Sequence, residues 1–204
     1  MIMLTIYLKT MTTFDQNYWE TRYQNDEAPW DSGTITPPLK EYIDQLTDKN
    51  MQILIPGAGN GHEFEYLVQQ GFTNAHMLDI ARPPLDNAAA RLPGLKDGQL
   101  ILDNFFEHKG QYDLILEQTF FCALSPDLRD TYVQKMHSLL APGGKIAGLL
   151  FDFPLTEQGP PFGGSSQEYI DRFDALFKIS ILHRAYNSIK PRADRELFFI
   201  FEKK

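Results

Sequence analysis

The sequence has little of several features that mark common classes of protein. Its 204 residues contain one cysteine, Cys122, which excludes an internal disulfide framework and a cysteine-rich metal site. The 19 lysines and arginines are outnumbered by 27 aspartates and glutamates, so the net charge is −8. A surface that binds the phosphate backbone of a nucleic acid needs clustered lysine and arginine side chains. We therefore expect no nucleic acid as a partner.

A long hydrophobic run is also missing. The apolar start of the chain covers about eight residues, whereas a helix that crosses a membrane needs about 20. It has neither a basic region before it nor a small-residue cleavage site after it. We expect a cytoplasmic protein without membrane contact, in which residues 1–13 are a flexible extension. A short strand or arm packed on the surface is the alternative for these residues.

The five histidines show no H-x-H or H-x-x-x-H spacing, so no metal site is expected. What remains, with 43% hydrophobic and 23% charged residues, is the composition of an ordinary globular protein. The length suits one domain with a sizeable core. We therefore assign residues 1–204 to a single domain, which we expect to be monomeric.

The hydrophobic pattern from residue 51 onward alternates between short apolar runs and helical periodicity. Ser125 is expected to cap one of the helices, with Pro126 in its first position. Strands that alternate with helices predict a parallel, doubly wound α/β sheet. The predicted strands lie at 51–56, 75–80, 98–103, 112–117 and 145–151, and the predicted helices at 61–70, 84–91 and 126–139.

The last quarter of the chain departs from this alternation. Residues 154–164 form a loop rich in proline and glycine. Ser165 and Glu168 have the spacing of a capping box, which predicts the start of another helix. The β-rich runs at 178–186 and 195–204 predict an antiparallel pair that closes the sheet.

The stretch "LIPGAGNGHEF" at 54–64 places alternating glycines between a predicted strand and a predicted helix. Such a turn usually holds a nucleotide-like ligand. A dinucleotide fingerprint needs G-x-G-x-x-G, and here its third glycine position is His62. This disfavours a nicotinamide-dependent oxidoreductase, which stays open as an alternative. Asp79 ends the second strand, 22 residues after Gly57, where a carboxylate can bind a ribose diol; a helix N-cap is its alternative role.

Polar residues also follow the third predicted strand. Asp103 and Asn104 come first and Phe105 follows. An acidic or amide side chain beside backbone N–H groups suits an adenine edge, although a polar strand end without a ligand is the alternative. With the glycine turn and Asp79, these residues describe an adenosine site that makes no provision for a pyrophosphate. Such a site suggests S-adenosylmethionine, whose sulfonium carries a fixed positive charge.

Residues 14–48 are mostly helical in pattern and are expected to cover the cofactor cleft. Trp19, Tyr23 and Trp30 lie in this segment, and aromatic faces attract a cation such as the sulfonium. The alternative is that these aromatic residues belong to the core, because Trp19 and Tyr23 have a helical spacing.

Four stretches form a specific combination of motifs. They are W-D-x-G-x-x-T-P at 30–37, "LIPGAGNGHEF" at 54–64, "YDLILEQTFFCALSPDLR" at 112–129 and "GPPF" at 159–162. The combination resembles the thiopurine methyltransferase superfamily, and within it the halide/thiol methyltransferase branch. The glycine motif alone is generic, whereas its occurrence with the first stretch and with "FFCA" is specific. The resemblance extends from about residue 14 to the end of the chain.

The resemblance implies a class I methyltransferase fold, a Rossmann-like three-layer sandwich with strand order 3-2-1-4-5-7-6 and an antiparallel seventh strand. It also implies methyl transfer from S-adenosylmethionine to a small, soft nucleophile. When the family's residue roles are transferred to the matching positions of this sequence, Tyr23 and Trp30 flank the cofactor. Gly57 then lies under the methionine part of the cofactor, and Asp79 binds its ribose. The predicted cofactor site comprises Trp19, Tyr23, Trp30, Gly57, Gly59, Asp79, Asp103, Asn104, Phe105 and Glu117.

Two positions depart from the family pattern. Asn104 stands where relatives of the family carry an aspartate near adenine. We therefore expect adenine to be contacted either by the Asn104 amide or by Asp103. Gln118 stands where thiopurine-type members have an arginine and the halide/thiol branch tends to have an aromatic residue. A neutral glutamine matches neither. We therefore predict a small thiol as the methyl acceptor, with a thiopurine or a halide as alternatives.

Methyl transfer to a thiolate is a one-step displacement, so we predict no catalytic acid, base or triad. Gln118, Phe120 and Phe162 are expected to line an uncharged acceptor pocket, with Phe162 closing over it; an ordinary loop aromatic is the alternative for Phe162. Cys122 has no histidine beside it and is expected to be a buried, inert thiol. A protein that binds the cofactor without catalysis would carry largely the same residues and stays open as the second alternative.

Overall fold

The computed structural model describes residues 14–204 of the chain. The prediction of a flexible extension at residues 1–13 therefore lies outside the described residues. Within them, no helix is both long enough and apolar enough to cross a bilayer.

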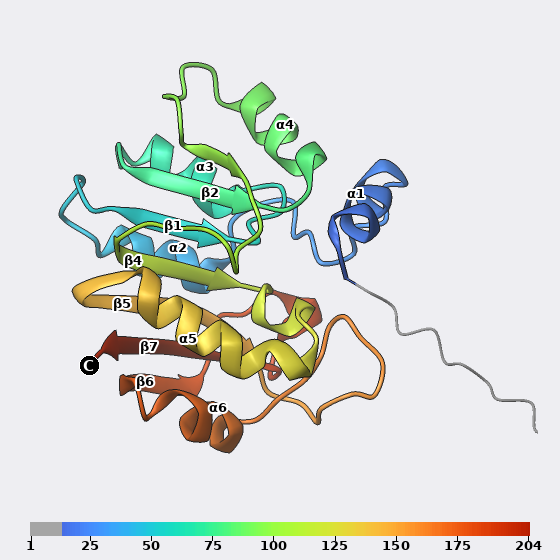
Figure 1. Ribbon diagram of the computed structural model, residues 1–204, viewed down its shortest axis with the longest axis vertical. Helices are drawn as coiled ribbons and strands as arrows, with labels where there is room; N and C mark the ends of the chain where they lie inside the picture. Colours follow the sequence, from blue (N-terminus) through green and yellow to red (C-terminus); the bar gives the residue numbers. More distant parts are fainter. Residues whose placement is uncertain (1–13) are drawn as a thin grey trace, which may run out of the picture.

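The centre of the fold is a seven-stranded sheet with the order β3-β2-β1-β4-β5-β7-β6 (Figure 1). β7 is antiparallel to both of its neighbours, while the pairs from β3 to β5 are parallel. This arrangement confirms the predicted class I methyltransferase sheet. The strands are β1 (Ile53–Pro56), β2 (Ala75–Asp79), β3 (Leu100–Leu102), β4 (Tyr112–Gln118), β5 (Leu140–Phe151), β6 (Phe177–Arg184) and β7 (Glu196–Lys203).

Helices pack on both faces of the sheet and bury it between two hydrophobic layers. Along β4, Leu114 and Leu116 point into one layer while Ile115 points into the other, as the period of two in a strand requires. Both layers are apolar, which explains why the parallel strands are continuous hydrophobic runs. One layer contains α2 (Pro37–Asp44), α3 (His62–Gln69) and α4 (Arg82–Arg91), and the other contains α5 (Arg129–Leu139) and α6 (Ser166–Phe173).

Two predicted boundaries around the fifth strand are wrong. The helix expected from Ser125 starts with a separate 3₁₀ turn at Pro126–Leu128, and the Ser125 side chain makes no capping bond. Instead the Leu128 N–H donates to the Ser125 carbonyl, which closes a tighter turn before α5. β5 begins at Leu140 rather than at 145. Tyr112 pairs with Leu140 and Leu114 with Lys145, so the residues between Leu140 and Lys145 form a bulge within β5, where Gly143 has a φ of +75°.

Other local predictions are confirmed. The Glu168 N–H donates to Ser165 Oγ at 3.3 Å, which caps α6 at its predicted start. β6 and β7 form the predicted antiparallel pair. The segment that connects them contains a short 3₁₀ turn, η3 (Lys190–Arg192).

The carboxyl ends of β1, β2 and β4 meet at one edge of the sheet, and α1 (Gln16–Gln24) stands beside that edge (Figure 1). In open α/β sheets, ligands bind outside the carboxyl ends of the strands where the strand order reverses. The reversal here lies between β1 and β4, which is therefore where a site is expected.

Candidate functional site

The glycine turn after β1 is shaped by aromatic side chains that lie against its backbone. Gly57 and Gly59 have φ values of +57° and +54°, a region that favours glycine. A Cβ atom on Gly57 would lie 2.2 Å from the ring of Phe120, and one on Gly59 would lie 3.0 Å from the Tyr23 hydroxyl. The turn therefore needs glycine for its conformation and for these close approaches.

Asp79 fastens this turn to the end of β2. Its Oδ2 accepts the N–H of Gly59 and its Oδ1 accepts the N–H of Ala81, each at 2.9 Å. Burial raises the pKa of Asp79 to about 6. The N-cap of α4 is Ala81 and no side chain caps that helix, so the alternative of Asp79 as a helix N-cap is wrong. Each carboxylate oxygen retains a further lone pair, so a ribose hydroxyl is an additional partner that the group can accept.

The aromatic residues of the N-terminal segment form a cluster above Gly59. Trp19 and Tyr23 both meet Trp30 edge to face, with ring centroids 5.4 and 5.7 Å apart. The Trp30 indole N–H donates to the Tyr23 hydroxyl at 3.3 Å. No residue of α1 is buried in this structure. The cluster is thus a partly exposed layer beside the strand ends, which argues against the alternative that these residues are core.

The polar residues after β3 hold their own turn together. Asp103 Oδ1 accepts the Asn104 N–H at 2.8 Å, and Asn104 Oδ1 accepts the Phe106 N–H at 3.0 Å. The ring of Phe105 is buried and packs against Phe120. Asp103 and Asn104 lie next to Asp79, because the Asp103 N–H donates to the Asp79 carbonyl. Their contacts with adenine stay a prediction.

Glu117 organises the turn after β4 from a fully buried position. Its Oε1 accepts the N–H groups of Phe120 and Phe121 at 2.7 and 2.9 Å, and the Tyr132 hydroxyl donates to its Oε2. Burial raises the pKa of Glu117 to about 7. These bonds fix the 3₁₀ turn η1 (Phe121–Ala123) and direct the ring of Phe120 onto Gly57. The side chain of Glu117 is therefore a structural group that positions the Phe120 ring against the glycine turn.

A pocket lies beside the glycine turn and brings together segments that are distant in the sequence. Gln118 lines it from the end of β4, with its Oε1 accepting the Thr36 hydroxyl at 3.0 Å. Gly57, Gly59 and Trp30 line it as well. The structure thus joins the predicted acceptor residue Gln118 to the predicted cofactor residues, as expected for a site of group transfer.

Charged residues that we did not assign to the site from the sequence also line this pocket. Asp31 Oδ1 and His62 Nε2 are 2.6 Å apart, and the Asn60 amide donates to the other Asp31 oxygen. The hydrogen bond with His62 lowers the pKa of Asp31, and the same bond raises the pKa of His62. This pair fastens the segment after Trp30 to the glycine turn.

Glu63 and Arg192 complete the charged lining, and both are buried. The expectation of an uncharged pocket around Gln118 is therefore wrong. Asp31 and Glu63 stand inside the quoted motifs at 30–37 and 54–64, so the signal for them was present. Arg192 lies in a short turn without periodicity, where no sequence pattern marks it.

Phe120 and Phe162, predicted to line the acceptor pocket with Gln118, have other places. Phe120 packs over Gly57, as described above. Phe162 is buried, and its N–H donates to the Cys122 carbonyl at 2.7 Å. Its ring lies 5.9 Å from that of Phe14, at the start of the described chain. A role for Phe162 as a closing side chain stays a prediction.

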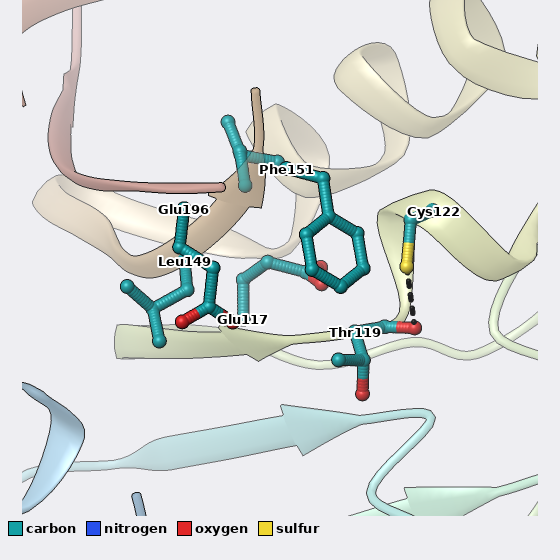
Figure 2. Close-up of a pocket in the computed structure, with 7 residues that line it drawn as sticks. Glu117, Thr119, Cys122, Leu149, Phe151 and Glu196 are labelled. Carbon is teal, nitrogen blue, oxygen red and sulfur yellow. Dashed lines mark hydrogen bonds between the residues drawn. The ribbon is translucent and has the colours of Figure 1, made fainter. Parts of the chain in front are cut away.

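Cys122 lines a small cavity at the end of β4, together with Thr119 and Phe151 (Figure 2). Its Sγ donates to the Thr119 carbonyl at 3.3 Å, and the carboxylates of Glu117 and Glu196 line the same cavity. Burial raises the pKa of the Cys122 thiol, so the thiolate is disfavoured. These contacts fit the predicted inert thiol. Within residues 14–204, no cluster of three or more His, Cys, Asp or Glu could hold a metal ion.

Comparisons with known proteins agree with this geometry. A sequence model of the thiopurine S-methyltransferase (TPMT) family matches residues 14–203. The chain is 30% identical to probable thiol methyltransferase 2 of Arabidopsis thaliana over 80% of its own length and 74% of that protein. It is 29% identical to thiocyanate methyltransferase 1 of Brassica oleracea, covering 90% and 84% of the two chains.

The fold is similar to that of a solved methyltransferase as well. The 1,6-didemethyltoxoflavin-N1-methyltransferase of Burkholderia thailandensis superposes with a TM-score of 0.75, covering 93% of this chain and 87% of that one. The sequence identity is 20%, so this likeness concerns the fold alone. That structure contains S-adenosylhomocysteine and the enzyme's 1,6-didemethyltoxoflavin.

Proposed function

The chain belongs to the thiopurine S-methyltransferase family and is an S-adenosylmethionine-dependent methyltransferase, and we propose that its methyl acceptor is a small thiol. The family predicted from the sequence motifs is thereby confirmed. The relatives named above are a probable thiol methyltransferase and a thiocyanate methyltransferase, which supports a small, sulfur-containing acceptor. A thiopurine or a halide stays an alternative acceptor.

The observation that carries the proposal is the meeting of three features at one edge of the sheet. They are the glycine turn, the buried Asp79 bonded to it, and the aromatic cluster above Gly59. This combination fits an adenosine whose ribose binds Asp79 and whose sulfonium faces the rings of Tyr23 and Trp30. Residues 14–48 then cover the cofactor, and Asp103, Asn104 and Phe105 border the adenine.

S-adenosylmethionine, when bound, supplies a methyl group on a positively charged sulfur. The chain has to hold the acceptor sulfur in line with that methyl group and to keep water away. Positioning of this kind can contribute about 7–11 kcal/mol in favourable cases. Gln118, which Thr36 orients, is the residue placed to do so, and Phe120, which Glu117 directs onto Gly57, shapes the turn beside it.

A general base is not required if the acceptor arrives as a thiolate. His62, the histidine on the pocket wall, uses Nε2 to bind Asp31 and so serves to fasten the N-terminal segment. We propose that it has no role in proton transfer. Its position also argues against the nicotinamide alternative, because a dinucleotide fingerprint needs a glycine where His62 makes this ion pair.

We further propose that the enzyme acts as a monomer in the cytoplasm, without nucleic acid or membrane partners. The net charge of −8 supports the absence of nucleic acid, and the single buried cysteine fits a reducing compartment.

A methyl-transfer assay tests the proposal. Thiols should be compared with alcohols and amines of the same carbon skeleton, and with a thiopurine and iodide. We expect turnover of thiols only, and a higher KM for S-adenosylmethionine in Asp79→Ala. Turnover confined to alcohols or amines would reject the thiol while leaving the cofactor site intact. Binding of S-adenosylhomocysteine without any turnover would favour a cofactor-binding protein, and binding of a nicotinamide dinucleotide instead would favour an oxidoreductase.

A further inference from the structure

One residue at the end of β4 has a backbone conformation that its own side chain disfavours. Thr119 has a φ of +59°, in the left-handed region. Within residues 14–204, the other residues besides glycine with a positive φ are Asp26 and Asp194, which are exposed and of a type that tolerates this region. A β-branched residue in this conformation is strained, and strain of this kind is concentrated where a side chain serves a function.

The neighbours of Thr119 hold it in this conformation. The buried Glu117 carboxylate accepts the N–H groups of Phe120 and Phe121, which directly follow Thr119 in the chain. The Thr119 carbonyl accepts the Cys122 thiol at 3.3 Å. All of these bonds are made by the backbone around Thr119, so a glycine at this position would make them without strain. The turn therefore does not need the threonine side chain.

The Thr119 side chain lies between two hollows. Thr119 lines both the small cavity beside Cys122 and the pocket beside the glycine turn. Figure 2 shows the Thr119 carbonyl directed toward Cys122 and the hydroxyl directed away from it, on the side opposite Glu117. Among the described residues 14–204 this hydroxyl has no hydrogen-bond partner, whereas the Thr36 hydroxyl is bonded to Gln118. An unused hydroxyl is thus available beside Gln118 on the pocket wall.

The place of Thr119 in the sheet favours contact with the acceptor rather than with the cofactor. β4 lies on the opposite side of β1 from β2. In the proposed function the ribose binds Asp79 at the end of β2, and the cofactor extends from there across the glycine turn. Thr119 and Gln118 lie beyond that turn, at the end of β4. The hydroxyl is therefore placed where the group that receives the methyl has to enter.

We propose that the Thr119 hydroxyl donates a hydrogen bond to the sulfur anion of the methyl acceptor, an inference that rests on the proposed function. A hydrogen bond to a charged atom is stronger than one to a neutral atom, so this bond favours the thiolate over the thiol in the pocket. The acceptor sulfur loses its negative charge as it gains the methyl group, so the bond is strongest before transfer. The hydroxyl therefore increases the affinity for the thiolate without accelerating the transfer itself.

Steady-state kinetics with Thr119→Val test the proposal, because valine keeps the shape and the branching of threonine and removes only the hydroxyl. We expect the KM for a thiol to rise about 10- to 100-fold, the range for a charge-assisted hydrogen bond. The kcat should stay within about threefold of wild type, as expected for the loss of ground-state binding. The KM for S-adenosylmethionine should not change. Thr119→Ser is the matched control: it keeps the hydroxyl and should keep a wild-type KM for the thiol.

Three results would overturn the inference. The first is an unchanged KM for the thiol in Thr119→Val. The second is an equal rise in the KM values for the thiol and for S-adenosylmethionine, which would show a general change of the pocket. The third is an equal effect of Thr119→Val and Thr119→Ser, because the hydroxyl would then be irrelevant. Wild-type protein that methylated no thiol would instead contradict the proposed function itself.

Thr119→Gly supplies an independent check, because stability and activity should change in opposite directions. Glycine adopts a positive φ without strain, so the melting temperature should rise by about 1–4 °C. The KM for the thiol should rise as it does in Thr119→Val, because the hydroxyl is absent from both. A lower melting temperature with an unchanged KM would show that the threonine is kept for stability, and it would overturn the inference.

Discussion

The two sides of the glycine turn are built in different ways. The adenosine side consists of residues at the ends of neighbouring strands, and its contacts are mostly to backbone N–H groups, as with Asp79 and Asp103. The pocket side joins Asp31, Gln118 and Arg192, which come from three distant parts of the chain and interact through side chains. One side follows directly from the order of the strands, whereas the other exists only when the whole fold is complete.

The two sides meet through aromatic rings that touch the turn itself. Phe120 packs over Gly57, and the Tyr23 hydroxyl lies against Gly59. Glu117 accepts the Phe120 N–H, and the Trp30 indole N–H donates to the Tyr23 hydroxyl, so each ring is held by a hydrogen bond. A change on one side is therefore expected to reach the other chiefly through the turn, which the following variants test.

The largest effect is expected at Arg129, whose side chain bonds both α6 and the end of the loop of residues 154–164. Arg129 is fully buried and donates to Glu168 Oε1 and to the Gly163 carbonyl, both at 2.7 Å. Arg129→Ala should lower the free energy of unfolding by about 2–5 kcal/mol, because it removes a large buried side chain and leaves the Gly163 carbonyl without its donor. Denaturant unfolding measures this change.

Arg172→Ala is the matched control for Arg129→Ala. Arg172 binds the same Glu168 oxygen at 2.9 Å from a more exposed position, so its loss should cost only about 0–1 kcal/mol. Similar losses for the two variants would show that burial does not distinguish the two ion pairs. The affinity of folded Arg129→Ala protein for S-adenosylhomocysteine should stay close to that of wild type.

The next effect concerns the adenosine side. Asp79→Ala should weaken S-adenosylhomocysteine by about 1–3 kcal/mol, through loss of charge-assisted hydrogen bonds. Calorimetry gives the affinity, and a melting curve shows how much the turn itself has loosened. A variant that bound as tightly as wild type would leave Asp79 with only its bonds to the N–H groups of Gly59 and Ala81, and the ribose assignment would be wrong.

Gly57→Ala tests the contact between the two sides. A Cβ atom at this position overlaps the Phe120 ring, so unfolding free energy should fall by about 1–3 kcal/mol and cofactor affinity should fall with it. Gly71→Ala is the control, because Gly71 also has a positive φ, of +84°, but nothing lies within 4 Å of its would-be Cβ. Equal costs for the two substitutions would mean that backbone strain, and not Phe120, explains the effect.

The smallest effect is expected from the Asp31–His62 pair. The pKa of His62 is raised in the folded state, so the pair contributes its full stability below the unfolded pKa of about 6.5. That contribution is lost as the pH rises through the raised value. The difference in melting temperature between wild type and His62→Gln should therefore be largest near pH 5–6 and shrink at alkaline pH. A difference that grew with pH would contradict the ion pair.

Much of this architecture could be predicted because it depends on local patterns. The short apolar runs predicted the strands, and the alternating glycines predicted a turn whose backbone adopts positive φ values. The charged pocket could not be predicted, because nothing in the neighbourhood of Arg192 in the sequence shows that it meets Trp30 and the glycine turn in space. The direction of the Phe120 ring could not be predicted either, because the buried Glu117 carboxylate sets it.

The start of β5 was misplaced for a related reason. The A-P-G-G run at 141–144 indicates the end of a helix, yet Leu140 already pairs with Tyr112 and the run forms a bulge within β5. A bulge of this kind depends on the neighbouring strand and has no signature of its own in the sequence.

The central claim is that methyl transfer depends on positioning a thiolate, without a catalytic base. The pH dependence of kcat/KM for several thiols of different acidity tests it most directly. The account predicts a midpoint that follows each thiol's own pKa and is unchanged in His62→Gln. A single midpoint shared by all thiols and abolished in His62→Gln would contradict it, because the histidine on the pocket wall would then be the base.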